Sequence, residues 1–216
     1  MASDLEIVLP CLDEAEALPA VLAGLPVGWP MLVVDNGSTD GTAQVASACG
    51  ARVLVEPRRG YGAAVHAGLV AACADVVAVL DGDGSLDPAA LPALAQLVLD
   101  GRADLAVGRR VPAAGVWPWH ARAGNAAVAA VLRRRGIPVH DIAPMRVARR
   151  RALLDLRVED RASGYPLELL LRAGAAGWRI VEQPVRYRAR AGGRSKVSGS
   201  VRGSLRAVRD MAGVLR

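Results

Sequence analysis

Two aspartates follow a strongly apolar stretch in the first half of the chain. The stretch VVAVL at 76–80 runs directly into Asp81 and Asp83, which are separated by one glycine. Two carboxylates at this spacing can share one Mg²⁺ or Mn²⁺, because magnesium sites use one or two carboxylates together with substrate phosphates. Glycines beside them let the backbone and a ligand approach closely. The pattern is therefore typical of a metal site for a phosphorylated substrate.

Two other interpretations apply to the same loop. A calcium-binding loop of the EF-hand type needs glycine at its sixth position and glutamate at its twelfth. Counted from Asp81, these positions are Leu86 and Pro92, so the spacing argues against calcium. A plain polar turn stays open on the loop alone, because glycine, aspartate and serine are ordinary turn residues.

The segments that position these aspartates alternate between strand-like and helix-like composition. Short runs rich in valine and leucine predict strands buried on both faces, at 5–10, 31–35, 51–55, 76–80 and 103–108. Helix-like stretches lie between them, at 14–25, 40–49, 61–73 and 88–100. This alternation predicts an α/β fold with a mainly parallel sheet and helices on both faces. Farther along we expect helices near 122–135, 163–174 and 200–215, and an edge strand at 179–187.

Charged residues gather where the predicted strands end. Ligands of such sheets bind beyond the carboxyl ends of the strands. The residues near those ends include Glu14, Asp35, Asp81 and Asp83, with arginine pairs at 58–59 and 109–110. This concentration on one edge of the sheet indicates the functional site more clearly than any single loop does.

The net charge of +6 divides unevenly along the chain. Residues 1–100 carry 3 Lys/Arg and 13 Asp/Glu, whereas residues 101–216 carry 24 and 8. Such asymmetry suggests different tasks for the two halves. The basic excess alone does not distinguish a solvated arginine-rich face from a surface that binds nucleic acid, anionic lipid or a phosphate-bearing substrate.

Targeting and cysteine patterns limit the class of protein. No run reaches the roughly 18 uninterrupted apolar residues of a membrane-spanning helix, and MASDLEIVLP does not look like a signal peptide. Cys11, Cys49 and Cys73 form neither a zinc pattern nor a disulfide framework. We expect a cytoplasmic protein. The basic amphipathic stretch at 200–215 either docks on the core or lies peripherally on the cytoplasmic face of the membrane.

The ordered motifs of the chain resemble the family 2 glycosyltransferases of GT-A fold. The matching stretches in the first half are PCLDEAEAL at 10–18, VVDNGSTDGT at 33–42, RRGYGAAVHAG at 58–68 and LDGDGSLDP at 80–88. The resemblance continues through VGRR at 107–110, RAGN at 122–125, GYPLEL at 164–169 and EQPVRYRARAGGRSK at 182–196. In order and spacing these motifs look like the polyprenyl-phosphate, or dolichyl-phosphate, sugar synthase branch.

This resemblance implies an organisation for the whole chain. Residues 1–216 would form a single GT-A domain with a Rossmann-like, mainly parallel sheet. Residues 1–110 would bind the nucleotide sugar and the metal. Residues 111–216, with a basic C-terminal loop and helix, would bind the acceptor.

The resemblance also implies roles for individual residues. Asp81 and Asp83 look like the family's DXD motif and would be the catalytic ligands of Mg²⁺ or Mn²⁺. The residues that would contact the nucleotide sugar are Pro10, Glu14, Asp35, Gly60 and Asp81. The residues that would contact the acceptor phosphate are Arg110, Arg122, Arg194, Ser195 and Lys196. The last three lie in a loop that resembles the motif R-x-x-G-x-S-K.

Many of these positions also have a purely structural interpretation. Pro10 can end a strand, Asp35 can cap a turn, and Arg122 can lie on a solvated helix face. Glu168, Asp141 and His120 are open between structural and functional roles. Trp117 and Trp119 either pack on the protein or cover a sugar or lipid chain.

Departures from the family pattern leave the donor and the acceptor open. Asp13 stands where the family usually has asparagine, and Asn36 stands where a second aspartate is common, so the nucleobase preference is not fixed. Ser85 replaces a glutamine or histidine that is a further metal ligand in many members. The stretch DIAPMRVARR at 141–150 replaces the common D-x-x-S-G-F-R.

The implied activity is metal-dependent, inverting transfer of a hexose from a UDP- or GDP-linked donor to polyprenyl phosphate or another anionic acceptor. A lipid phosphate is already a nucleophilic oxyanion near neutral pH, so no general base is required. Transfer to a soluble or protein acceptor is the main alternative. A non-catalytic binder of an anionic surface or nucleic acid is a remote one, and we expect no nucleic-acid partner. A membrane-anchored partner, which would compensate for the missing membrane-spanning segment, is a further alternative.

Overall fold

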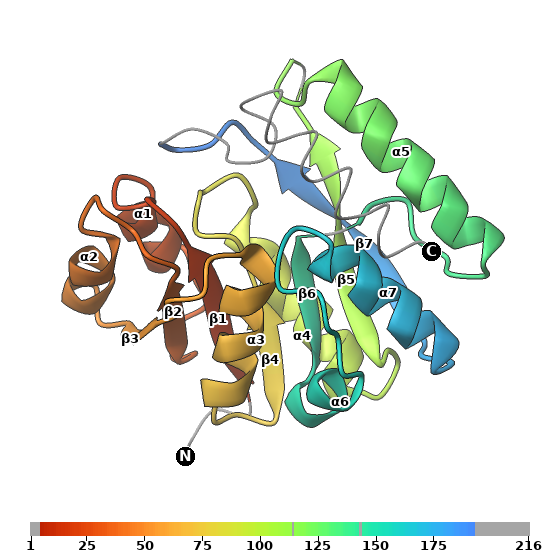
Figure 1. The fold of residues 1–216 in the computed structure, drawn as a ribbon, viewed down its shortest axis with the longest axis horizontal. Helices are drawn as coiled ribbons and strands as arrows, with labels where there is room; N and C mark the ends of the chain where they lie inside the picture. Colours follow the sequence, from red (N-terminus) through yellow and green to blue (C-terminus); the bar gives the residue numbers. More distant parts are fainter. Residues whose placement is uncertain (1–4, 114, 143, 193–216) are drawn as a thin grey trace.

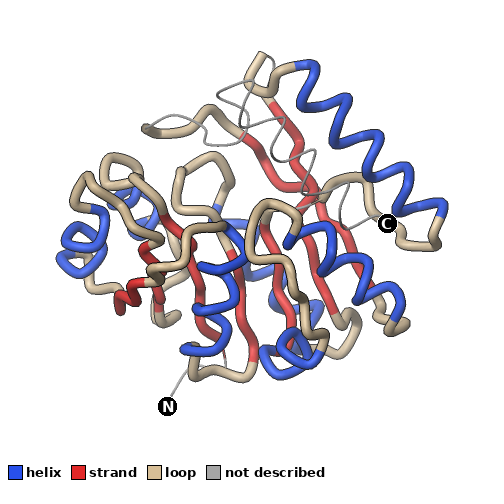
Figure 2. The backbone as a smooth tube through the Cα atoms, viewed as in Figure 1, coloured by secondary structure: helices blue, strands red, loops and turns tan. Residues whose placement is uncertain are grey.

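The structure of the chain, a computed structural model, describes residues 5–113, 115–142 and 144–192. Seven strands form one sheet in the order β3-β2-β1-β4-β6-β5-β7, and helices cover both of its faces (Figure 1, Figure 2). This arrangement confirms the predicted α/β fold. The helix expected at 200–215 and the residues Arg194, Ser195 and Lys196 lie outside the described residues.

Most elements lie where the apolar patterns place them. The strands are β1 (Leu5–Cys11), β2 (Met31–Asp35), β3 (Arg52–Val55), β4 (Val76–Val79), β5 (Leu105–Pro112), β6 (Met145–Arg149) and β7 (Ile180–Tyr187). The helices are α1 (Leu18–Ala23), α2 (Thr42–Ala48), α3 (Tyr61–Ala71), the short 3₁₀ helix η1 (Pro88–Ala90), α4 (Leu91–Leu99), α5 (Trp119–Arg134), α6 (Arg150–Asp155) and α7 (Tyr165–Ala175). Within the described ranges, no helix combines the length and the apolar character that crossing a membrane requires.

The sheet is parallel except at one strand. β1 pairs in parallel with β2 and β4, β2 pairs with β3, and β5 pairs with β7. β6 is antiparallel to both of its neighbours, β4 and β5. The carboxyl ends of the other six strands therefore lie at one edge, which we call the carboxyl edge. β7 ends the strand order, so Pro184 lies in an edge strand as predicted.

The sequence pattern does not indicate β6 or α6. β6 reads MRVAR, and its side chains are buried except for the last. Arg146 within it is only 2% exposed. A sequence indicates a strand by a run of apolar residues or by alternation of apolar and polar residues. A buried arginine within only five residues interrupts the run and breaks the alternation.

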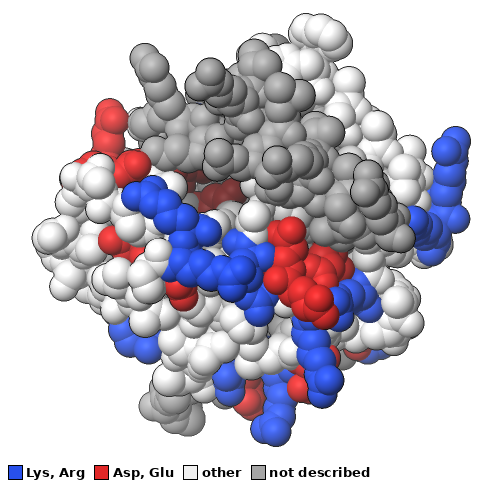
Figure 3. Space-filling view, in the orientation of Figure 1, with Lys and Arg blue, Asp and Glu red and all other residues white. Residues whose placement is uncertain are grey.

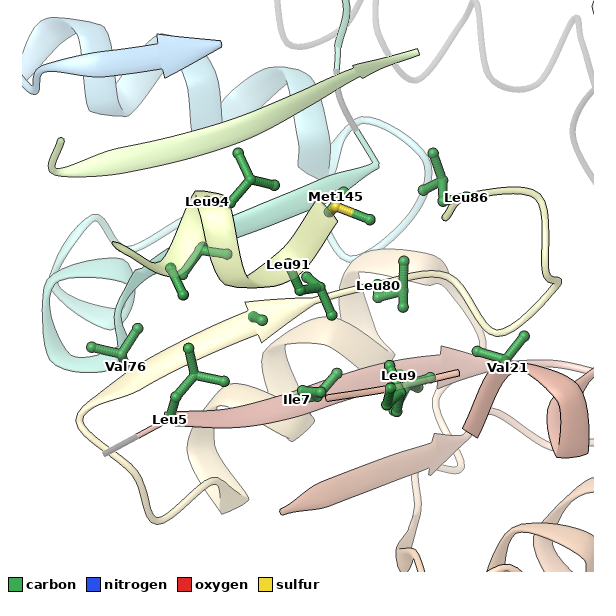
Figure 4. Packing of buried hydrophobic residues seen from close by; sticks show 14 of the residues in the cluster. Leu5, Ile7, Leu9, Val21, Val76, Leu80, Leu86, Leu91, Leu94 and Met145 are labelled. Atoms are coloured by element: carbon green, nitrogen blue, oxygen red, sulfur yellow. The ribbon is translucent and has the colours of Figure 1, made fainter. Parts of the chain in front are cut away.

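Alternating side chains of β1 build a core on each face of the sheet. Leu5, Ile7 and Leu9 pack on one face with Leu91 and Leu94 of α4 and with Met145 of β6 (Figure 4). Val8 packs on the opposite face among residues of α3 and α7. Each large aliphatic side chain buried in this way contributes about 1.5–3 kcal/mol. Both cores also contain residues of β2 and β7, so each face of the sheet has one continuous apolar interior.

Candidate active site

The loops after β1 and β2 are joined to each other at the carboxyl edge. The Asp13 N–H donates to Ser38 Oγ at 2.9 Å, and the Asp13 carboxylate accepts the Thr39 N–H at 2.8 Å. The Glu14 N–H donates to Thr42 Oγ1 at 2.9 Å. Asp13 also has a φ of 51°, which aspartate tolerates better than most residues. These bonds fix Glu14 in place and give Asp13 a structural function.

Asn36, directly after β2, holds the loop that leads into α3. Its Nδ2 donates to the carbonyl oxygens of Glu56 and Arg58 at 3.0 and 2.8 Å, and its Oδ1 accepts the Gly60 N–H at 2.8 Å. An amide can donate and accept at once, which the ionised aspartate common in the family cannot. A side chain at Gly60 would collide with the carbonyl oxygen of Arg161. The structure thus gives Gly60 a packing function at the start of α3.

The Cys11 thiol lies among the four carboxylates that the sequence places at the site. Burial raises the pKa of the Cys11 thiol well above its usual value, and the charges of Glu14, Asp81, Asp35 and Asp83 raise it further. Cys11 is also paired with Asp35 across β1 and β2, and a side chain at Gly82, between Asp81 and Asp83, would collide with the Cys11 Sγ atom. The ends of β1, β2 and β4 therefore bring the predicted acidic residues to one place.

Asp81 is held in an environment that disfavours its charge. Its Oδ1 atom is buried and has no hydrogen-bond partner among the described residues. Burial, and next the charge of Asp83, raise the pKa of Asp81 to about 7, against the opposing effects of Arg146, Arg110 and Arg190. A buried carboxylate oxygen without a donor favours binding of a proton or a cation.

Arg190, beyond the end of β7, connects the acidic loop to the loop after β1. Its guanidinium lies 2.8 Å from Asp83 Oδ2 and 3.2 Å from Glu14 Oε1. The Ala191 N–H donates to the carbonyl oxygen of Asp83 at 3.1 Å. The second half of the chain therefore supplies a cation directly to the acidic site.

The oxygens of the acidic loop fit Mg²⁺ or Mn²⁺. Asp81 offers its buried Oδ1, and the Asp83 carboxylate is aligned by the Ser85 N–H, which donates to Asp83 Oδ1 at 2.8 Å. In the part of the chain that the structure describes, no three or more His, Cys, Asp or Glu side chains are grouped to hold a metal by themselves. Two carboxylates suffice for magnesium when substrate phosphates complete its coordination. The residues thus fit a metal that binds together with a phosphorylated ligand.

Arg110, in the last part of β5, is held in a fixed orientation. Its Nε and Nη2 donate to the two carboxylate oxygens of Asp141 at 2.8 and 2.6 Å. The guanidinium stacks on the Trp117 ring at 4.1 Å, and the Tyr187 ring centre lies at 5.6 Å. Burial would lower the pKa of Arg110, but its hydrogen bonds and attraction to Asp141 outweigh burial and raise that pKa. Arg110 is therefore a permanently charged group beside an aromatic surface.

Pro10 and Arg122, two other residues predicted for the site, make no hydrogen bond or ion pair with its charged groups among the residues that the structure describes. Pro10 is partly exposed in β1, opposite Val34 of β2. Arg122 is exposed on α5. Asn125, three residues later, accepts a long hydrogen bond of 3.4 Å from Arg110 Nη2. Residues three apart share a helix face, so Arg122 is on the face of α5 that approaches Arg110.

Glu168 and Trp117, whose roles the sequence leaves open, make contacts within the protein. The Glu168 carboxylate accepts the N–H groups of Glu159 and Asp160 at 3.0 and 2.7 Å. Trp117 packs on Arg110, as described above. Trp119 remains 79% exposed and lies edge-on to the His120 ring at 5.9 Å.

Sequence reasoning misses Arg190 and Arg146. Counted back from Lys196, the R-x-x-G-x-S-K spacing places its first arginine at 190, whereas the sequence analysis assigns Arg194. Arg146 is buried in β6 and donates to Tyr61 Oη at 3.4 Å, close enough to Asp81 to influence its charge. No spacing rule indicates that arginine, because its strand was not recognised.

Charged side chains from the two halves of the chain form ion pairs with each other. Figure 3 shows Lys and Arg side chains beside Asp and Glu in the middle of one face. Ion pairs cross between the halves, including Arg188 with Asp87 at 3.0 Å and Arg190 with Glu14 and Asp83. The uneven charge along the sequence thus becomes a site with carboxylates and guanidinium groups in contact.

Comparison with known proteins gives one family and several similar chains. Residues 6–157 match the model described as Glycosyl transferase family 2. An uncharacterized glycosyltransferase of Mycobacterium tuberculosis is 62% identical over 213 residues, which are 97% of each chain. A dolichyl-phosphate hexose transferase of Haloferax volcanii is 35% identical over 194 residues, 88% of this chain and 85% of the relative.

Solved structures share the fold. The crystal structure of glucosyl-3-phosphoglycerate synthase from Mycobacterium tuberculosis, in complex with Mn²⁺, UDP and glucosyl-3-phosphoglycerate, superimposes with a TM-score of 0.78 at 22% identity. The match covers 98% of this chain and 78% of the other. At this identity the likeness concerns the fold alone.

Proposed function

Because this chain belongs to glycosyltransferase family 2, we propose that it transfers a hexose from a nucleoside-diphosphate sugar to a polyprenyl phosphate, with inversion at the anomeric carbon. The observation that supports this most is the placement of Asp81 and Asp83 at the same sheet edge as Arg110, which is charged, fixed and bordered by aromatic rings. The 35% identical relative named as a dolichyl-phosphate hexose transferase supports a lipid phosphate as acceptor.

On the donor side, the loops of residues 1–110 would enclose the nucleotide. We propose that Pro10, Glu14, Asp35 and Gly60 contact the nucleoside. Asp81 and Asp83 would hold Mg²⁺ or Mn²⁺, which when bound neutralises the departing diphosphate. Arg190 already lies between Asp83 and Glu14, so its positive charge is available to the same diphosphate.

On the acceptor side, residues 111–216 together with Arg110 would receive the phosphate. Arg110 presents a fixed guanidinium, and we propose that Arg122 of α5 also contacts the acceptor phosphate. We propose that Arg194, Ser195 and Lys196 add further phosphate contacts. An oxygen of the acceptor phosphate forms the bond to the anomeric carbon while the bond from that carbon to the diphosphate breaks, and the nucleoside diphosphate leaves. The acceptor is already ionised, so no side chain needs to remove a proton.

The setting of the reaction follows from its acceptor. A polyprenyl phosphate is anchored in lipid, so we propose that the protein acts peripherally at the cytoplasmic face of the membrane. The nine Lys/Arg residues and one aspartate of residues 186–216 would favour approach to an anionic surface.

The test is a screen of donors with a short prenyl phosphate, using purified protein with Mn²⁺ or Mg²⁺ and product detection by mass spectrometry. We expect one nucleotide sugar to yield a prenyl-phosphate hexose, and chelation of the metal or Asp83→Ala to abolish the product. Arg110→Ala should raise the acceptor KM about ten- to a hundredfold and leave the donor KM nearly unchanged.

Arg179→Ala serves as the matched control, because Arg179 pairs with Asp104 at 2.8 Å far from the carboxyl edge. Parallel reactions with 3-phosphoglycerate and with water as acceptors separate a lipid acceptor from a soluble one. If the folded protein neither transfers nor hydrolyses any nucleotide sugar, the proposed function is wrong.

A further inference from the structure

Glu182 holds the loop of residues 140–142, which contains Asp141, the carboxylate that binds Arg110. Glu182 is in β7, where it pairs with Val107 of β5, three residues before Arg110. Its Oε1 accepts the N–H groups of His140 and Asp141 at 2.7 and 3.1 Å. Its Oε2 lies 2.9 Å from His140 Nδ1. The carboxylate therefore satisfies two consecutive backbone donors of a loop that has no strand or helix to satisfy them.

The same loop is fastened from its other side by α5. The Asn125 side chain donates to the His140 carbonyl oxygen at 3.3 Å, and its Oδ1 accepts the Ile142 N–H at 3.2 Å. Side-chain hydrogen bonds thus hold the segment 140–142 between an edge strand and a helix. Both Glu182 and Asn125 lie in elements that the sequence predicts, and the proposed function gives neither side chain a direct role.

This loop carries the carboxylate that orients Arg110. Asp141 is 1% exposed, accepts both guanidinium bonds from Arg110, and also accepts its backbone N–H at 2.9 Å. A planar guanidinium held by two parallel bonds has a defined direction, and a shift of its partner turns it. Asp141 therefore fixes the direction of the Arg110 guanidinium, and Glu182 and Asn125 together hold the loop that carries Asp141.

We propose that Glu182 is a positioning residue for the acceptor, acting through Asp141 to aim Arg110. This inference rests on the proposed function of Arg110 as a ligand of the acceptor phosphate. Glu182 has no direct contact with either substrate in this scheme. Its loss should weaken use of the acceptor and spare the donor, because the carboxylates of the donor side are held by separate bonds from the loops after β1 and β2.

Two substitutions at Glu182 separate positioning from charge. Glu182→Gln retains an oxygen that can accept both backbone N–H groups, whereas Glu182→Ala leaves both groups without that acceptor. We expect the alanine variant to raise the acceptor KM about ten- to a hundredfold, the order expected for a misplaced binding group. The glutamine variant should stay near the wild-type value, and the donor KM should hardly move in either.

A double-mutant cycle decides whether Glu182 acts through Arg110. If it does, Glu182→Ala should have little further effect on the acceptor KM in a protein that already carries Arg110→Ala. Asp104→Ala is the matched control, since Asp104 accepts the Arg179 N–H at 2.8 Å at the opposite end of the β5–β7 pair. Effects that multiply fully in the double variant would overturn the inference.

A readout without turnover keeps the inference distinct from the proposed function. The Arg110 Nε–H donates to Asp141, so its resonance in ¹H–¹⁵N spectra reports whether that pair is intact. We expect this resonance to shift or broaden in Glu182→Ala and to remain in Glu182→Gln and Asp104→Ala. An unchanged resonance in Glu182→Ala would refute the positioning step even in an active enzyme. A wild-type protein that transfers no sugar to any prenyl phosphate would instead refute the proposed function, and the spectra would still decide whether Glu182 orients Arg110.

Discussion

At the scale of single residues, the site is built from charges that would repel each other without a ligand. Asp81 and Asp83 lie close together with Glu14 and Asp35 around the buried Cys11 thiol. Arg190 neutralises some of this charge by pairing with Asp83 and Glu14, but Asp81 keeps a buried oxygen without a donor among the described residues. Such strain is expected where binding of a cation and an anionic substrate releases it.

Asp81→Asn should therefore stabilise the protein in the absence of metal. The pKa of Asp81 is about 7 in the folded chain, against about 4 when unfolded. Between these values the native state binds more protons than the unfolded state, so stability falls as pH rises. Asparagine mimics the protonated form and removes this loss. We expect a gain of about 1–3 kcal/mol in the free energy of unfolding at pH 8, measured with urea, and almost none at pH 4.

The control for this prediction is Asp75→Asn, at an exposed aspartate next to β4. It should give no gain that grows with pH. A gain in Asp81→Asn of equal size at both pH values would mean that burial of the charge is not its cause. The same variant should lose transferase activity, since a neutral amide binds a divalent cation poorly.

At the scale of elements, the start of α3 is set by contact with the loop before α7. The N–H groups of Gly62 and Ala63 donate to the carbonyl oxygens of Ala162 and Arg161 at 3.1 and 2.9 Å. These bonds satisfy two of the donors that a helix leaves open at its N-terminus. Gly60 has a φ of 143°, and no side chain fits between it and Arg161.

Gly60→Ala should accordingly destabilise the fold by about 2–4 kcal/mol, because it combines a backbone conformation unsuited to alanine with a steric collision. Gly50→Ala is the comparison, since Gly50 also has a positive φ of 84° but has no atom within 4 Å of an added Cβ. That change should destabilise by only about 1–2 kcal/mol. Equal urea midpoints for the two variants would contradict the packing function of Gly60.

The elements also explain what could be predicted from the sequence. Runs of valine and leucine in β1, β2 and β4 are long enough to indicate parallel strands, and the topology of such sheets then brings Asp35, Asp81 and Asp83 to one edge. Arg110 and the motif that contains Arg190 came from the family resemblance. The anchoring of Arg110 by Asp141, and of Asp141 by Glu182, depends on contacts over 31 and 41 residues. A local sequence pattern cannot indicate contacts over such distances. The strand that follows Asp141, β6, is also not predicted, because the buried Arg146 interrupts its apolar run.

At the scale of the whole molecule, two groups of strands form one continuous sheet. β3, β2, β1 and β4 come from the first half of the chain, and β6, β5 and β7 complete the order. The antiparallel pairing of β4 with β6 joins them. Apolar residues from both regions mix in each of the two cores, so neither region has an interior of its own.

We therefore predict a single cooperative unfolding transition. Trp29 packs against the core on one face, and Trp178 packs against the core on the other. One variant would keep Trp29 and the other Trp178 as its only tryptophan. The urea midpoint from fluorescence should be the same in the two variants, and in each it should match the midpoint from circular dichroism. Separate midpoints that persist after correction for the stability of each variant would mean that the two regions unfold independently.

The order of the strands has an evolutionary consequence. The chain passes from the β3-β2-β1-β4 side of the sheet to the β6-β5-β7 side only once in the described residues, through α4. A single recombination event in the link between α4 and β5 would thus exchange β5, β6 and β7 and leave the loops after β1, β2 and β4 untouched. Ancestral genes of this fold could diversify what receives the sugar by one crossover, provided that the incoming segment still paired with β4 and brought an arginine to Asp83.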